Sequence, residues 1–66
     1  MTIVCNGEPM ELADTSSLHH LLASIGCDRP GVAVAIDDSV VPSARWKTTL
    51  LQNGNRVIVI QAAQGG

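Results

Sequence analysis

Residues 56–66 read RVIVIQAAQGG, and this stretch places the strongest constraint on the fold. Its run of β-branched residues is typical of a β-strand. Because side chains alternate across a strand, Val57 and Val59 belong to one face. The opposite face then carries Ile58 and Ile60. Both faces are apolar, so the fold has to cover at least one of them with a second layer.

One amphipathic helix is available for that cover. Residues 14–17, Asp-Thr-Ser-Ser, supply several possible N-cap side chains. Behind them, apolar side chains recur at i, i+3, i+4 and i+7 and cluster within roughly one third of the helix circumference. These are Leu18, Leu21, Leu22 and Ile25. Gly26 is expected to end the helix and Pro30 to prevent its resumption. The spacing predicts a helix over about Leu18 to Ile25.

A hairpin is predicted at the start of the chain. Residues 2–5 are rich in β-formers, and they are followed by Asn6-Gly7, the dipeptide most typical of a two-residue hairpin turn. Residues 8–12 alternate as a return strand. Pro9 cannot donate a backbone hydrogen bond, so this return strand is expected at an edge of the sheet.

The middle of the chain predicts further strands. Residues 32–36 are apolar on both faces and fit the sheet interior, and residues 48–51 predict a short strand. Residues 43–47 predict a single turn whose Trp46 ring covers one end of the core. The whole is an α+β roll with one helix against one sheet face. The sheet face away from the helix then either meets a partner or lies under residues 40–47.

Length and composition exclude several classes of protein. Sixty-six residues describe one domain, 1–66, near the lower size limit for independent folding. The net charge is −2, the four basic residues are scattered and one aromatic ring is present, so no nucleic-acid partner is expected. No apolar run approaches the ~20 residues of a membrane span. Since no secretion signal is visible either, the expected localisation is cytoplasmic.

Cysteine and histidine do not predict a metal or redox site. Cys5 and Cys27 could form at most one bridge, and an intracellular setting favours free thiols. His19 and His20 are adjacent and point about 100° apart on a helix, so they cannot share a metal ion. No recognisable catalytic triad or phosphate-binding loop is present.

The terminal Gly65-Gly66 is the one feature that suggests chemistry. Two glycines leave the free carboxylate on a flexible, unbranched tether that could thread a narrow channel in another protein. From Ala62 to Gly66 the extended chain reaches roughly 17 Å. The ionised carboxylate can attack the α-phosphate of ATP to give an acyl-adenylate.

The sequence resembles the ThiS family of thiamine-biosynthesis sulfur carriers, small β-grasp proteins that share their fold with ubiquitin. The resemblance covers essentially the whole chain. It is carried by the order of Val41-Pro42, Arg45-Trp46, Asn53-Gly54 and Gly65-Gly66. It implies a carrier rather than an enzyme, with a mixed sheet of four to five strands packed on one helix.

The resemblance also implies a reaction cycle. In the family, a ThiF-type enzyme uses ATP to adenylate the terminal glycine, which is then converted to a thiocarboxylate with sulfur drawn from cysteine through a desulfurase. A ThiG-type thiazole synthase receives that sulfur. By position, Gly66 would hold the adenylate and then the sulfur, and Gly65 would keep the tether narrow. The chain itself is expected to bind no cofactor.

The implied partner interface lies on and beside the last strand. The resemblance places Val57 and Val59 against the helix. The residues expected to face partners are Val4, Ile58, Ile60, Ala62 and Gln64.

Three alternatives remain open at this point. The chain could carry sulfur for another pathway, such as molybdopterin, cysteine or tRNA thiolation, or modify proteins through Gly-Gly. It could be a plain interaction module with an incidental Gly-Gly end. It could also be a small redox or metal domain that uses Cys5 and Cys27 with the histidines.

Overall fold

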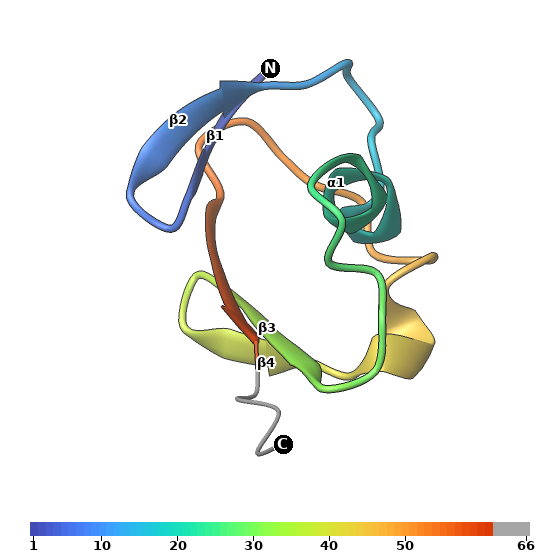
Figure 1. Ribbon diagram of the computed structural model, residues 1–66. Helices are drawn as coiled ribbons and strands as arrows, with labels where there is room; N and C mark the ends of the chain where they lie inside the picture. Colours follow the sequence, from blue (N-terminus) through green and yellow to red (C-terminus); the bar gives the residue numbers. More distant parts are fainter. Residues whose placement is uncertain (62–66) are drawn as a thin grey trace.

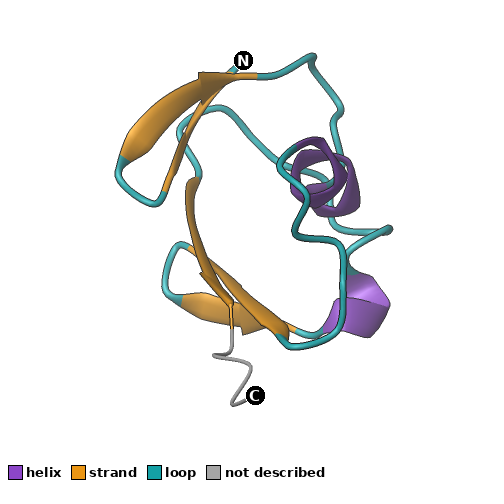
Figure 2. Ribbon diagram, in the orientation of Figure 1, coloured by secondary structure: helices purple, strands orange, loops and turns teal. Residues whose placement is uncertain are grey.

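Five strands and one α-helix form two layers, with the helix lying across one face of the sheet (Figures 1 and 2). The computed structural model describes residues 1–61. In chain order the elements are β1 (Thr2–Cys5), β2 (Glu8–Glu11), α1 (Leu18–Ser24), β3 (Val32–Ile36), β4 (Ser39–Val41), the 3₁₀ turn η1 (Ser43–Arg45) and β5 (Arg56–Gln61).

The sheet has the strand order β2-β1-β5-β3-β4. β5 pairs in parallel with β1, while all other neighbours are antiparallel. The most apolar strand therefore occupies the centre, where both of its edges are covered. β2, which contains Pro9, lies at an edge as predicted. The predicted mixed sheet of four to five strands on one helix is confirmed.

Two tight turns set the register of the two hairpins. Asn6 and Gly7 have φ values of 50° and 84° and join Cys5 to Glu8, as the sequence predicts. Asp37 and Asp38 have φ values of 47° and 71° and form the second turn, between β3 and β4. Aspartate tolerates this left-handed conformation better than most residues, because its short side chain can bond locally.

The backbone amides in the first turn of α1 donate to acceptors outside the helix. The Ser17 hydroxyl accepts from the amide of His20 at 3.0 Å, so Ser17 is the N-cap among residues 14–17. The amides of Leu18 and His19 donate to the carbonyls of Thr49 (2.8 Å) and Trp46 (3.0 Å). The first-turn amides, which have no partner within a helix, therefore join α1 to the loop before β5.

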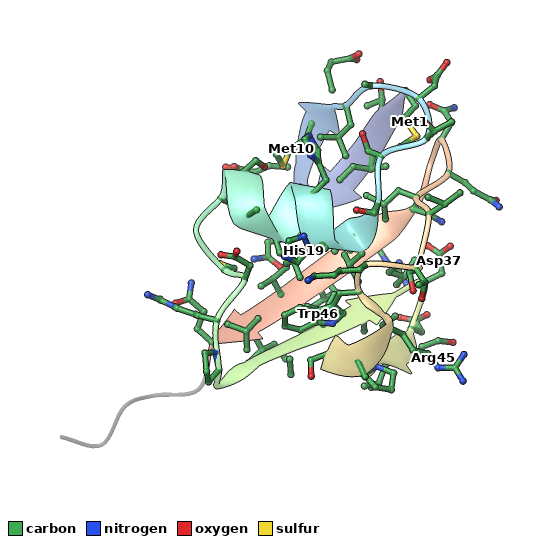
Figure 3. The ribbon with its side chains drawn as sticks, turned by 90° about the vertical axis from the view of Figure 1, so that its right-hand side faces the viewer. Met1, Met10, His19, Asp37, Arg45 and Trp46 are labelled. Carbon is green, nitrogen blue, oxygen red and sulfur yellow. The ribbon has the colours of Figure 1, made fainter. Side chains whose placement is uncertain are left out.

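The core lies between α1 and the sheet. Its buried apolar residues are Ile3, Cys5, Leu18, Leu21, Leu22, Cys27, Val34, Trp46, Leu51, Val57 and Val59. Figure 3 shows Trp46 over β3, on the same side of the sheet as α1. Its indole nitrogen donates to the carbonyl of Val41 at 3.1 Å, so the polar atom of this buried ring is paired. The predicted core role of Trp46 is confirmed.

The prediction for Ile25 is wrong in one respect. Its side chain was expected on the buried helix face, but it is 38% exposed. The helix ends at Ser24, and the backbone of Ile25 (φ −108°, ψ 8°) has already left the helical path. Gly26 follows with φ 75°, which confirms the predicted stop.

The predicted strand at residues 48–51 is also wrong. Leu50 forms only an isolated bridge to Ser17. The hydroxyls of Thr48 and Thr49 donate to the carbonyl of Arg45 at 3.3 and 2.7 Å, which holds the segment to the preceding turn. Its backbone groups are used at the start of the helix, so they are not available to the sheet.

Candidate functional site

The face of β5 opposite the helix is the first part of the candidate site. Val57 and Val59 are 0% and 9% exposed on the helix side, as predicted. Ile58 and Ile60 are 36% and 60% exposed on the other side. Over residues 1–61, no second layer covers this side of the sheet (Figure 1). Two large β-branched side chains in the central strand are thus left to solvent, which is typical of an interaction surface.

Register places neighbouring strands on the same surface. Ile58 pairs with Ala35 and Ile60 with Ala33, and Ala35 pairs in turn with Val40. Val4 lies on this side as well, because its neighbours Ile3 and Cys5 are buried in the core. We call this surface the outer face; it comprises Val4, Ala33, Ala35, Val40, Ile58 and Ile60.

The outer face is not covered by residues 40–47, which was the alternative left open by the sequence. β4 extends the sheet beyond β3, and Val40 is 77% exposed. Trp46 packs in the core on the helix side. Arg56, the first residue of β5, lies beside Val4 on this face. Its guanidinium donates to both carboxylate oxygens of Asp38 at 2.8 Å.

The side chain of Asn6 extends the pairing between β1 and β5 past the end of β1. The last backbone pair is Cys5 with Val57, after which the chain turns away. The Asn6 side-chain oxygen accepts from the amide of Val59 at 2.8 Å, and its nitrogen donates to the carbonyl of Val59 at 3.3 Å. A side-chain amide thus replaces a backbone peptide and keeps Ile58 and Ile60 aimed outward. The sequence assigned Asn6 to the turn alone.

Replacing Asn6 tests this bridge. Asn6→Ala removes two partly buried hydrogen bonds, at about 1 kcal/mol each, so we expect a loss of about 2 kcal/mol in the free energy of unfolding. A further loss of stability is expected because alanine disfavours the left-handed backbone conformation at this position, where φ is 50°. Asn6→Gly separates the two causes, because glycine accepts this backbone conformation but makes no side-chain bond. Urea unfolding measures both variants; an Asn6→Gly variant as stable as the original chain would show that the bridge contributes nothing.

The second part of the candidate site is the end of β5. Gln61 is the last residue that the structure describes. The predictions for Ala62, Gln64, Gly65 and Gly66 lie outside the described residues and stay predictions. Gln61 itself, which the sequence did not single out, is held by side-chain bonds to Arg29 and Cys27.

The cysteines and histidines do not form a reactive site in the described part of the chain. Cys5 and Cys27 are both free and buried. Burial raises the pKa of the Cys5 thiol, and the nearby Cys27 and Glu8 raise it further, so this thiol is protonated and poorly nucleophilic at neutral pH. His19 lies 3.9 Å from Asp28, and His20 is exposed.

Two observations on residues 1–61 concern metal and small-molecule binding. No group of three or more potential metal-ligating side chains comes together there. A pocket of about 310 Å³ beside β3 is lined by residues 28–32, Ser43 and Trp46, and offers one carboxylate, Asp28, and one guanidinium, Arg29. In the same range, no helix is both long and apolar enough to cross a membrane.

A mixed five-stranded sheet with a parallel central pair and one helix across one face defines the β-grasp class of the ubiquitin-like proteins. Within that class, the chain belongs to the ThiS family, which it matches over residues 3–66. It is similar to the sulfur carrier protein ThiS of Escherichia coli strain K12, with 30% identity over 66 residues and full coverage of both chains.

Solved structures agree on the fold. The crystal structure of the thiamine biosynthesis protein ThiS from Geobacter metallireducens matches with a TM-score of 0.83 at 22% identity, covering the whole of both chains. A solution structure of a thiamine biosynthesis protein from the same organism matches with a TM-score of 0.80 at 22% identity, covering all of this chain and 88% of the other. The predicted family, fold and class, a carrier rather than an enzyme, are confirmed.

Proposed function

We propose that this chain is a sulfur carrier of thiamine biosynthesis and that it carries sulfur as a thiocarboxylate on Gly66. The observation that carries the proposal is the family match, which runs to the last residue and so includes Gly65 and Gly66. The fold supports it, because the central strand β5 leads directly into this terminal segment.

The proposed chemistry has two steps at one carboxyl group. A carboxylate oxygen of Gly66 attacks the α-phosphorus of ATP, the α–β phosphoanhydride bond breaks, and pyrophosphate leaves. A sulfur nucleophile at the oxidation level of sulfide then attacks the carbonyl carbon of the acyl-adenylate. AMP leaves with the electron pair of the carbon–oxygen bond, and a thiocarboxylate remains. The activated acyl group makes the second step feasible, because a free carboxylate resists attack by a nucleophile.

The residues of this chain would bind the partner enzymes and present the terminal carboxylate to them, and the partners would catalyse the reactions. We propose that the outer face docks on a ThiF-type adenylating enzyme, which binds the ATP, and later on a ThiG-type thiazole synthase. Ile58 and Ile60 are apolar and exposed in the central strand, so they suit the core of such an interface. Gly65 has no Cβ and would let the tail enter a narrow channel. A cysteine desulfurase would supply the sulfur as a persulfide, and a thiol reductant would bring it to the oxidation level of sulfide.

We also place this cycle in the cytoplasm. Adenylation consumes ATP, and both cysteines of the chain are free thiols, as expected in a reducing compartment.

An intact-mass measurement tests the function. The chain is incubated with a ThiF-type enzyme, ATP, cysteine, a cysteine desulfurase and a thiol reductant. We expect a gain equal to the exchange of one oxygen for one sulfur, located at Gly66 by fragmentation, and no gain when ATP is omitted. A chain that gains no sulfur from this system, or that gains it on Cys5 or Cys27, would contradict the proposal.

The same labelled chain distinguishes the pathway. Offered both a ThiG-type thiazole synthase and the large subunit of a molybdopterin synthase, it should bind and deliver sulfur to the first. Preference for the second would assign the carrier to another pathway.

A further inference from the structure

Gln61, at the end of β5, is held at both ends of its side-chain amide. Its oxygen accepts a hydrogen bond from the guanidinium of Arg29. Its nitrogen donates to the sulfur of Cys27 at 3.3 Å. Arg29 and Cys27 both belong to the segment between α1 and β3, and Cys27 is only 5% exposed. The end of the central strand is therefore tied to a point that is itself anchored in the core.

The backbone pairing on one edge of β5 has ended before Gln61. The amide of Val59 is turned toward Asn6, and alternation turns the amide of Gln61 to the same edge. β1 stops at Cys5, and Asn6 has already turned away there. Toward β3, Gln61 lies opposite Val32, the first residue of that strand. Gln61 therefore has no β1 residue beside it, and on the other side it faces the first residue of β3. The side-chain bonds to Arg29 and Cys27 supply much of the restraint at this position.

Gln61 is also the residue from which the terminal segment continues. Five residues separate it from the Gly66 carboxylate, a reach of at most about 17 Å. A partner docked on the outer face meets Ile58 and Ile60 in the same strand. It would therefore receive the terminal segment from a starting point that the contacts of Gln61 hold in place.

We propose that Gln61 and Arg29 form a clamp that positions the C-terminal segment for the adenylating enzyme. Both would act as positioning residues: Arg29 holds Gln61, and Gln61 fixes the point from which the terminal segment starts. The inference rests on the proposed function and adds to it two residues outside the outer face.

The clamp predicts a specific kinetic signature. Releasing Gln61 leaves one more residue to be ordered when the enzyme binds, and the entropy of fixing one backbone residue corresponds to a factor of about five to thirty. This entropy is lost when the carrier associates with the enzyme, before the chemical step. KM for the carrier should therefore rise by that factor while kcat stays within about twofold. ATP–pyrophosphate exchange by the adenylating enzyme measures both constants for the full-length chain.

The variants form a double-mutant cycle. Arg29→Ala and Gln61→Ala should each raise KM, and the double variant should be no worse than the worse single variant, because both remove one contact. Gln61→Glu should retain most of the activity, since its carboxylate accepts from Arg29. Arg45→Ala is the matched control: it removes an exposed arginine whose side chain makes no hydrogen bond or ion pair within residues 1–61.

Each of the following results would rule out the clamp. A KM unchanged in Arg29→Ala overturns the clamp, and so do additive losses in the double variant, which would mean that Arg29 contacts the enzyme directly. An equal loss in Arg45→Ala would show a general effect of charge and would also overturn it. A natural chain that is never adenylated overturns the proposed function and the clamp together. Thermal unfolding confirms that each variant is folded before its kinetics are compared.

Discussion

Deletion of Gly66 is expected to abolish adenylation and sulfur transfer while the fold stays intact. The variant still ends in a glycine carboxylate, but that group is withdrawn by about 3.5 Å along the chain. A misplacement of about 1 Å can cost about 100-fold in rate, so activity should fall by at least that factor and below detection in an intact-mass assay. Adding one alanine after Gly66 should have the same effect, because the carboxylate then lies too far out and next to a Cβ atom.

A chain of natural length that ends in a carboxamide separates position from chemistry. It presents the same backbone to the partner but has no anionic oxygen to attack ATP, so it should bind the adenylating enzyme and not react. Circular dichroism and thermal unfolding should match the unmodified chain for all three variants. An extended chain that still accepts sulfur would falsify the terminal-carboxylate mechanism.

Charge on the outer face is expected to produce the second large effect. Ile58→Asp and Ile60→Asp together place two carboxylates in the centre of the proposed interface, where they would be buried without partners. Hot-spot residues near the centre of an interface cost about 2 kcal/mol or more when truncated, so we expect affinity for the adenylating enzyme to fall by about 100-fold or more. Calorimetry or surface plasmon resonance measures the dissociation constant.

Leu50→Asp is the matched control for this surface. Leu50 is 61% exposed, almost equal to Ile60 at 60%, but it lies in the loop before β5 and not on the outer face. The control should bind normally, and all variants should remain folded. Equal loss of binding in Leu50→Asp would show that the effect is not specific to the outer face. Normal binding by the double variant would exclude the face as the docking surface.

Periodic patterns in the sequence account for the parts of the fold that could be predicted. The alternation from Val57 to Ile60 divided β5 into its two faces correctly, because a strand has a period of two whatever its neighbours are, and the family resemblance indicated which face is buried. The spacing of Leu18, Leu21 and Leu22 located the helix, and Asn6-Gly7 located the first turn. The exposed part of the candidate site, Ile58 and Ile60, followed from that alternation together with the resemblance to the family.

The parts that could not be predicted depend on polar groups that meet only after folding. Asn6 and Val59 are 53 positions apart, and Arg29 and Gln61 are 32 apart, so no local pattern relates them. Residues 48–51 have strand propensity, yet their backbone bonds go to the helix start, because an amphipathic helix leaves its first amides unpaired. In that segment, tertiary contacts outweighed local propensity.

The position of β5 has a consequence for how the protein assembles. Among the strands of residues 1–61, β5 alone joins the β1–β2 hairpin to the β3–β4 hairpin, and it is the last of these strands in sequence. Until it inserts, the earlier part of the polypeptide is two detached hairpins and a short helix, none of which buries enough apolar surface to persist alone. Folding should therefore be all-or-none, and a fragment cut before Arg56 should behave as a denatured chain. The strand that precedes the reactive end thus also completes the sheet, so the chain can fold only after its synthesis has passed through β5.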